Sequence, residues 1–270
     1  MTLSASEKRT AFRALHDQGC FVLPNPWDVG GARLLQSLGF KALASTSAGF
    51  AWSIGKADNA VTRDEVLAHL ASLCAATDLP VNADFEGGFA DAPKDVAANV
   101  ILALKTGVAG LSIEDRALAG PSPLYDHGLA VERIAAARSA MDAEAPEAIL
   151  VARCEAALVG PVDLDLIIAR LTAFAEAGAD CLFAPGLSKP EQISAVVAAV
   201  APKPVNVVLG LGATVAGLAG LGVRRVSVGG GLSRAAWTGF IRAARELATD
   251  GTLTSLEGAV GGGEINGLFR

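Results

Sequence analysis

The sequence has few charged residues and no concentrated positive charge. Lys, Arg, Asp and Glu make up only 19% of its 270 residues, whereas 51% are hydrophobic. A chain of this length and composition can bury a large core, which excludes disorder as its main state. The net charge is −6, and no basic run or Lys/Arg-rich face occurs. We therefore expect no nucleic-acid partner, whereas small anionic substrates remain compatible with local Arg residues or a metal ion.

Cysteine pairs, a targeting segment and membrane spans are also missing. The four cysteines are scattered without a C-x-x-C pair, which favours reduced thiols and predicts a cytoplasmic protein. Residues 1–19 carry charges throughout and contain no apolar core of the kind a signal peptide needs. The most hydrophobic stretch, 204–223, contains a proline and five glycines, so it predicts a buried strand and a short helix. We expect no membrane partner.

Several catalytic signatures are absent. No G-x-S-x-G, P-loop or H-E-x-x-H pattern occurs in the sequence. The corresponding hydrolase, kinase and zinc-protease classes therefore have no residues to support them.

Short apolar runs alternate with segments of helical period along the whole chain. The runs are residues 20–24, 42–46, 79–84, 109–115, 148–153, 180–185, 204–209 and 224–229. Eight strand–helix units in one chain of this size predict an α/β fold of the (β/α)8 TIM-type barrel class. No linker divides the chain, so we predict one domain over 1–270, with an extra N-terminal helix in 1–19. Residues 250–270 form either a C-terminal tail or an intersubunit arm.

Polar residues collect where the predicted strands end. In this fold the C-terminal ends of the strands build the open face of the barrel that carries the reacting groups. Candidate substrate contacts at these ends are Trp27, Ser45, Ser47, Ala48 and Asn206. A glycine loop after the eighth strand, 228–231, could hold phosphate or could serve close packing.

Three carboxylates stand at neighbouring strand ends: Asp84, Glu86 and Glu114. They would repel one another unless a cation lay among them, and hard oxygen ligands without nearby His or Cys pairs suit Mg²⁺. An aspartate after a strand also commonly caps a helix, which is the role we expect for Asp28. For Glu86 and Glu114 a structural role is an equal alternative.

Arg153 ends the fifth strand. A guanidinium at this place can clamp a substrate carboxylate with two hydrogen bonds. A salt bridge to Glu155 or Glu114 is the alternative, and the two roles can coexist.

Four segments together resemble the isocitrate lyase/phosphoenolpyruvate mutase superfamily, over about residues 20–240. They are LPNPWDVGGARLLQSLGFKALASTSAGFAWSIGKADN, LPVNADFEGGFA, GVAGLSIED and ILVARCEAAL. The resemblance implies a (β/α)8 barrel whose eighth helix is often swapped between subunits, in a homodimer or homotetramer. It also implies Mg²⁺, with Mn²⁺ as an alternative, acting on a small carboxylate substrate through an enolate-like species.

The resemblance also assigns roles to individual residues. Ser47 and Ala48 match the backbone that contacts substrate, and Asp58 matches an acid on a gating loop spanning about 52–59. Asp84 matches the principal metal-site aspartate, Glu114 an acid that supports metal-bound water, and Arg153 the arginine that clamps substrate. Catalytic roles thus go to Asp58, Glu114 and Arg153, and metal ligation to Asp84, Glu86 and Glu114.

The sequence departs from the superfamily pattern in three places. Asn82 stands where many members have the first acid of Asp-x-Asp, the loop after the fourth strand lacks a cysteine, and Pro185 replaces the histidine of the mutase. We therefore predict a Mg²⁺-dependent carbon–carbon lyase or decarboxylase for a small α-oxo or 2-hydroxy dicarboxylate, with an oxaloacetate-like substrate. The alternatives are a phosphonopyruvate-type or carboxyphosphonate-type enzyme that acts on a carbon–phosphorus bond, and a barrel that binds an oxo acid without turnover.

Overall fold

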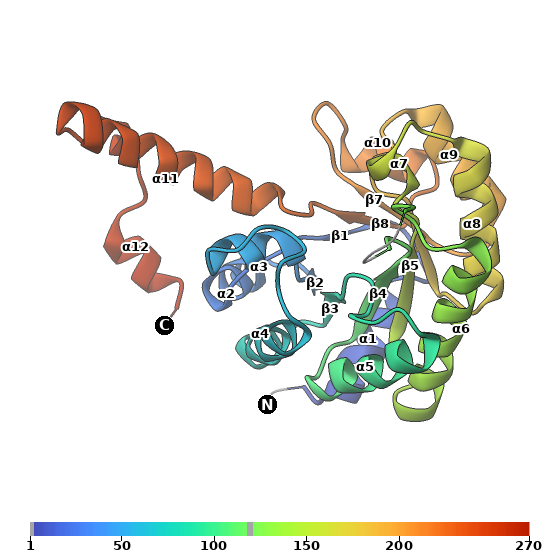
Figure 1. The fold of residues 1–270 in the computed structure, drawn as a ribbon. Coiled ribbons are helices and arrows are strands. Elements are labelled where there is room, and N and C mark those ends of the chain that lie inside the picture. Colours follow the sequence, from blue (N-terminus) through green and yellow to red (C-terminus); the bar gives the residue numbers. More distant parts are fainter. Residues whose placement is uncertain (1–2, 118–120, 270) are drawn as a thin grey trace.

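Eight parallel strands form a nearly closed barrel (Figure 1). The computed structural model describes residues 3–117 and 121–269. The strands pair in the order β1-β8-β7-β6-β5-β4-β3-β2. They are β1 (Phe21–Leu23), β2 (Leu43–Ala44), β3 (Val81–Asp84), β4 (Gly110–Glu114), β5 (Ile149–Arg153), β6 (Cys181–Phe183), β7 (Val205–Val208) and β8 (Arg225–Ser227). The Ala44 amide donates to the Pro24 carbonyl at 3.0 Å and joins the two end strands. The predicted (β/α)8 barrel is confirmed.

Helices follow the strands around the outside of the barrel (Figure 1). They are α1 (Ala5–Ala14), α2 (Val29–Ser37), α3 (Ser47–Ser53), α4 (Arg63–Ala76), α5 (Pro93–Lys105), α6 (His127–Glu144), α7 (Ala156–Val159), α8 (Leu164–Glu176), α9 (Pro190–Val200), α10 (Val215–Gly220), α11 (Gly231–Asp250) and α12 (Gly262–Gly267). A 3-10 turn covers Thr254–Leu256. The sequence did not predict α3 and α7, because helices of seven and four residues are too short to show helical periodicity.

Local signals explain where the longer helices begin. The Thr62 hydroxyl accepts from the Glu65 amide, and the Glu65 carboxylate accepts from the Thr62 amide, which is a capping box at the start of α4. Pro93 and Pro190 open α5 and α9, where the missing N–H of proline costs no hydrogen bond. Between strands, Gly110 of β4 allows β5 to approach closely, because a Cβ there would lie 2.6 Å from the Ile149 carbonyl oxygen.

The barrel interior has an apolar lower part and a polar upper part. Phe12 of α1 packs with a cluster inside the barrel that includes Leu23, Ile149 and Cys181. The expected N-terminal helix within 1–19 therefore closes one end of the barrel, although α1 ends at Ala14. Above this cluster the buried inward side chains become polar: Asn82, Ser112, Asn206, Arg225 and Ser227. The polar part is the floor of the site described below.

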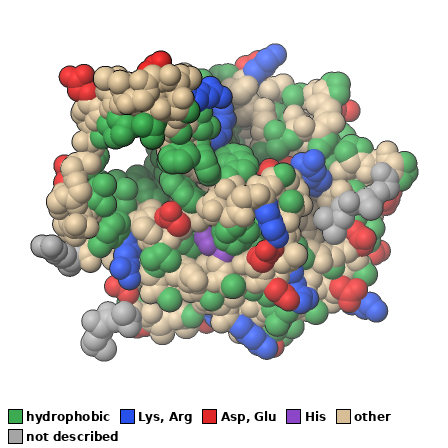
Figure 2. Space-filling model, turned by 60° about the vertical axis from the view of Figure 1, so that its left-hand side comes forward, with side chains coloured by type: hydrophobic (Ala, Val, Ile, Leu, Met, Phe, Trp, Pro, Cys, Tyr) green, Lys and Arg blue, Asp and Glu red, His purple; other side chains and the backbone are tan. Residues whose placement is uncertain are grey.

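The last helix of the barrel repeat stands apart from the other helices. α11 projects away from the strands, and α12 turns back beside it (Figure 1). The exposed hydrophobic residues of α11 are Leu232, Trp237, Phe240, Ile241 and Leu247. Figure 2 shows hydrophobic side chains on this arm and on the part of the barrel that faces it. Exchange of this helix between subunits stays a prediction. No helix within 3–117 and 121–269 is long and apolar enough to span a membrane.

Candidate active site

A small polar cavity opens at the C-terminal ends of the strands. Its volume is about 210 Å³. Residues on or after all eight strands line it, among them Asn25, Ser45, Ser47, Ala48, Asp58, Asn82, Asp84, Ser112, Arg153, Pro185, Asn206, Arg225, Ser227 and Gly229. Since drug-sized ligands occupy pockets of roughly 300–1,000 Å³, this cavity suits a smaller molecule.

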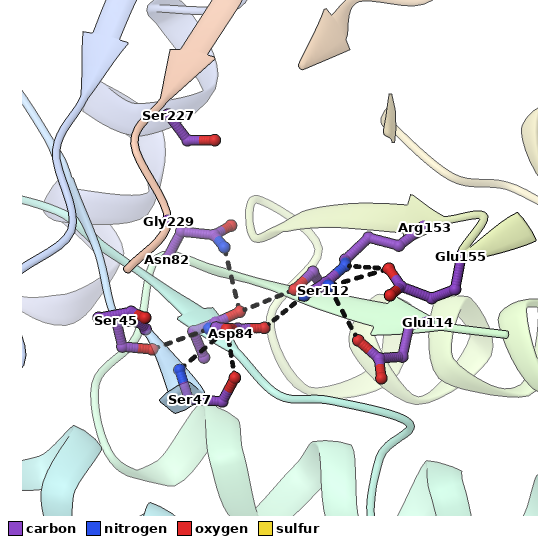
Figure 3. Close-up of polar contacts among 12 residues, drawn as sticks. Ser45, Ser47, Asn82, Asp84, Ser112, Glu114, Arg153, Glu155, Ser227 and Gly229 are labelled. Atoms are coloured by element: carbon purple, nitrogen blue, oxygen red, sulfur yellow. Dashed lines mark hydrogen bonds and ion pairs between the residues drawn. The ribbon is translucent and has the colours of Figure 1, made fainter. Parts of the chain in front are cut away.

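Asp84 lies at the centre of the cavity wall (Figure 3). One of its carboxylate oxygens, Oδ2, accepts from the Ser47 amide at 2.9 Å and from the Ser47 hydroxyl at 2.8 Å. The Asp84 amide donates to the Ser45 hydroxyl at 2.8 Å. Neighbouring β2 and β3 thus hold the carboxylate in one orientation, because serines immediately after β2 reach across to the last residue of β3.

Arg153 joins Asp84 to two buried glutamates (Figure 3). Its Nη1 lies 2.6 Å from Asp84 Oδ1, and its Nη2 lies 3.0 Å from Glu114 Oε2 and 2.9 Å from Glu155 Oε1. Burial opposes a charge on this guanidinium, but Glu114, Glu155 and Asp84 outweigh burial and raise the pKa of Arg153. The salt bridges expected as an alternative to substrate clamping are therefore present, and Arg153 acts as the central cation of an acidic cluster.

The sequence analysis missed the support behind Arg153. The Glu155 amide donates to Asp115 Oδ1 at 2.8 Å, and Arg170 Nη1 bonds Asp115 Oδ2 at 3.1 Å. This chain of buried groups fixes the direction of the Glu155 carboxylate toward Arg153. Its only sequence signal was an acid shortly after each of two strand ends: Asp115 directly follows Glu114, and Glu155 stands two residues after Arg153.

Asp58 comes from the segment between α3 and α4 and lines the same cavity. Its Oδ1 accepts from the Asn59 amide at 3.0 Å. Burial and the charge of Asp84 raise the pKa of Asp58. The structure thus brings Asp58 and Asp84 to one cavity, as expected. Trp52 and Ser53, which the predicted gating loop of about 52–59 included, belong to α3, and a gating role of the residues that follow stays a prediction.

Glu86 and Glu114 lie outside the cavity lining. Burial, followed by the charges of Asp84 and Asp58, raises the pKa of Glu86 to about 7, and its Oε1 has no hydrogen-bond partner in the described structure. Burial also raises the pKa of Glu114, against the opposing charge of Arg153. Glu86 is therefore suited to hold a proton near neutral pH, whereas Glu114 is an ion-pair partner of Arg153.

We expect Glu86→Gln to change the pH dependence of stability. The folded Glu86 carboxyl keeps its proton up to about pH 7, whereas a glutamate at its ordinary value of 4.5 loses it earlier. The folded state therefore binds more protons between these values, and wild-type stability falls as pH rises through this range. Glutamine removes that loss, so the variant should gain on the order of 2–3 kcal/mol over wild type between pH 4 and pH 8.

Urea unfolding of the chelator-treated protein at several pH values measures this gain. Glu132→Gln, at an exposed position of α6, is the control and should leave the curve unchanged. A Glu86→Gln curve parallel to that of wild type would contradict the assignment.

The remaining predicted substrate contacts fall into two groups. Ser45, Ser47, Ala48 and Asn206 line the cavity as expected. Trp27 does not: it lines a separate apolar pocket with Trp237 and Phe240 of α11. The reason is the turn after β1, which directs Asn25 to the cavity; Asn25 Oδ1 accepts from the Val228 and Gly229 amides at 2.9 Å. Those two amides of the glycine loop are therefore occupied by Asn25.

The acidic side chains around the cavity decide how the expected divalent ion could bind. No group of three or more His, Cys, Asp or Glu side chains within 3–117 and 121–269 has the arrangement of a metal cluster. Of the three predicted ligands only Asp84 reaches the cavity; Glu114 bonds Arg153, and Glu86 faces another pocket. Mg²⁺ is commonly held by one or two carboxylates together with water and substrate. Asp84 fits that manner of binding, whereas the described residues do not form a site built by all three predicted acids.

Comparisons with known proteins place the chain among enzymes. The chain is 36% identical over 222 residues to an uncharacterized protein of Mycobacterium tuberculosis, covering 81% of each. It is 29% identical over 199 residues to an oxaloacetate decarboxylase of Pseudomonas aeruginosa, covering 72% of this chain and 68% of the other. A Burkholderia cenocepacia protein of known structure is 51% identical and superposes with a TM-score of 0.94, over 98% of this chain and 96% of that one.

The family model for phosphoenolpyruvate phosphomutase matches residues 12–248, nearly the whole barrel. The predicted superfamily is thus confirmed, and with it the prediction of an enzyme of the lyase and mutase type. By this match the chain belongs to the phosphoenolpyruvate phosphomutase family, within the isocitrate lyase/phosphoenolpyruvate mutase superfamily.

Proposed function

We propose that the protein is a carbon–carbon lyase that cleaves a small α-oxo or 2-hydroxy dicarboxylate, with oxaloacetate as the first candidate substrate. The observation that carries the proposal is the cavity itself. It is small, it is lined by hydrogen-bonding groups, and its lining includes Asp58 together with the Asp84–Arg153 pair. The identity to an oxaloacetate decarboxylase supports the same substrate class.

Arg153 and Asp58 have different roles in the proposed reaction. Arg153 holds the Asp84 carboxylate in place, and this carboxylate supplies negative charge to the cavity wall. Asp58, whose pKa is raised by burial and by Asp84, can hold a proton near the reacting carbon and deliver it to the product enolate.

A divalent ion completes this proposal. Asp84 would hold it, with water and substrate oxygens as the other ligands. When bound, the ion supplies positive charge against the oxyanion that develops on the keto acid.

A carbon–phosphorus enzyme is the second candidate, because the family model that matches is that of phosphoenolpyruvate phosphomutase. Pro185 argues against it. This residue lines the cavity after β6, where the superfamily's mutase carries a histidine, and proline has no group that can bind or protonate a phosphoryl oxygen.

Two assays with Mg²⁺ present separate these functions. Pyruvate release from oxaloacetate supports the lyase, and phosphate release from phosphonopyruvate supports the second candidate. If neither product forms while calorimetry detects oxalate binding, the barrel binds oxo acids without turnover, and the proposed function is wrong.

We propose that α11 mediates a homodimer or homotetramer. Apolar side chains on this helix are exposed to solvent, among them Phe240 at 64%. Exposed apolar patches of this kind commonly mark protein interfaces. Phe240→Asp should therefore shift the mass measured by light scattering from an oligomer to a monomer.

The matched control for this experiment is Leu211→Asp. Leu211 is a fully exposed apolar residue in the turn after β7, far along the chain from α11. It should leave the mass unchanged. A wild-type protein that is monomeric at all concentrations would contradict the proposal.

A further inference from the structure

Arg225 is a buried cation on the floor of the cavity. It is only 3% exposed, lies on β8 and lines the cavity. Its Nε donates to Asn206 Oδ1 at 3.0 Å, and its Nη1 lies 3.5 Å from Asn82 Oδ1. The Phe12 ring lies beneath the guanidinium, 5.7 Å from its central carbon. All of these partners are neutral.

The other buried arginines of the barrel have partners of a different kind. Arg153 pairs with three carboxylates and Arg170 with Asp115. Arg133 also has no ion pair with a described acid, but its Nη1 and Nη2 donate to three backbone carbonyls, those of Gly87, Ala90 and Asp91. Arg225 has no ion pair with any described Asp or Glu.

The titratable groups near Arg225 do not supply a negative charge. Burial raises the pKa of the Cys181 thiol to about 11. Burial, together with the charge of Arg225, lowers the pKa of His16 to about 3. Both groups are therefore neutral at physiological pH.

An unpaired buried charge is unfavourable, because the desolvation of the guanidinium is not offset by a counter-ion. Such a charge beside a cavity is explained when a ligand anion completes the pair. The other arginine that lines the cavity, Arg153, is already bonded to Asp84 and Glu155. Among the described residues of the lining, Arg225 is therefore the cation that has no carboxylate partner and can receive an anion.

Ser227 provides a second donor at the same place. Its hydroxyl oxygen accepts from Asn206 Nδ2 at 3.0 Å, and among the described residues no acceptor takes its proton. It lines the cavity two residues after Arg225 on β8, so both side chains point into the barrel.

We propose that Arg225, with Ser227, binds the carboxylate of the substrate that lies farthest from the reacting carbonyl. The proposal rests on the proposed function and deepens it. The substrate is then an acid with two anionic groups: one end lies on the barrel floor at Arg225, and the carbonyl end lies near Asp58 and Asp84. A monocarboxylic oxo acid would leave Arg225 unpaired and should bind weakly.

Malate and lactate test the proposal, because they are 2-hydroxy acids that differ in the distal carboxylate. Calorimetry of the full-length protein with Mg²⁺ should give a dissociation constant at least about tenfold lower for malate than for lactate. Arg225→Gln should bring the two constants within about twofold by weakening malate alone. Arg225→Lys should retain part of the preference. The control is Arg224→Gln, the adjacent arginine, which bonds the Gly19 carbonyl away from the cavity.

Thermal unfolding of the ligand-free variants separates a ligand-binding role from a structural one. If Arg225 awaits an anion, Arg225→Gln should leave the melting temperature unchanged or raise it, because it removes an unpaired buried charge. A lower melting temperature with an intact preference for malate would overturn the proposal. So would a wild-type protein that binds malate and lactate equally.

The oxaloacetate assay keeps the two proposals distinguishable. Turnover of oxaloacetate without a malate preference refutes the role of Arg225 and leaves the proposed lyase in place. An Arg225-dependent malate preference without turnover supports the anion site and refutes the lyase.

Discussion

Arg153→Met is expected to lower kcat/KM for oxaloacetate by about 10²- to 10³-fold or more, the effect of removing one preorganised charged donor from an active site. The methionine leaves Asp84, Glu114 and Glu155 close together without their common cation. The Asp84 carboxylate then loses one of the contacts that orient it toward the cavity. Because removal of one partner from a buried ion pair is costly, the variant should also lose about 3–5 kcal/mol of stability.

Arg138→Met is the matched control for this change. Arg138 lies on α6, outside the barrel, and pairs with Asp142 and Asp180; its side chain is 13% exposed against 14% for Arg153. It should lose stability and keep its kinetic constants. Steady-state kinetics and urea unfolding of both variants measure the two effects. Equal kcat/KM losses in both would show that Arg153 acts through stability alone.

Asp84→Asn should reduce kcat/KM by a similar factor while changing stability much less, by about 1–3 kcal/mol. The amide has the shape of the carboxylate but no charge, and its NH₂ group cannot accept from both Ser47 and Arg153. The substitution therefore removes a negative charge from the cavity wall and removes the carboxylate proposed to hold the metal ion. The concentration of Mg²⁺ that gives half-maximal rate should rise as well.

Asp28→Asn provides the comparison. Asp28 also follows a strand, but its carboxylate accepts from the Gly31 amide at 2.6 Å and caps α2. Asparagine caps helices about as well as aspartate, so this variant should match wild type in rate and stability. Wild-type kinetics for Asp84→Asn would remove Asp84 from the mechanism.

The period of the hydrophobic pattern was sufficient to predict the barrel. Eight apolar runs with helical segments between them allow few other arrangements, because connections between parallel strands are short and of one hand. The C-terminal ends of the strands meet at one rim of such a barrel, so the sequence also placed Asp84, Ser45 and Asn206 together at that rim. Asp28 was correctly expected to cap a helix. A helix cap depends only on residues close by in the chain, and Asp28 accepts from the amide of Gly31 at the start of α2.

The partners of each side chain were beyond the sequence. Whether Arg153 meets substrate or acids depends on the β4–β5 register, which sets Glu114 directly opposite it. Trp27 and Asn25 differ by two positions in one turn, yet only Asn25 reaches the cavity. Glu86 was expected beside a metal, but a backbone φ of 47° carries it to another pocket.

The sequence by itself thus determined the fold, the family and the rim on which the chemistry lies, because periodicity and strand-end position depend on neighbours along the chain. Only the tertiary structure decided which acids surround Arg153 and that Arg225 lies unpaired on the cavity floor. Charge pairing is set by distances of a few ångströms and by burial, and both arise only when strands far apart in the chain close into one barrel.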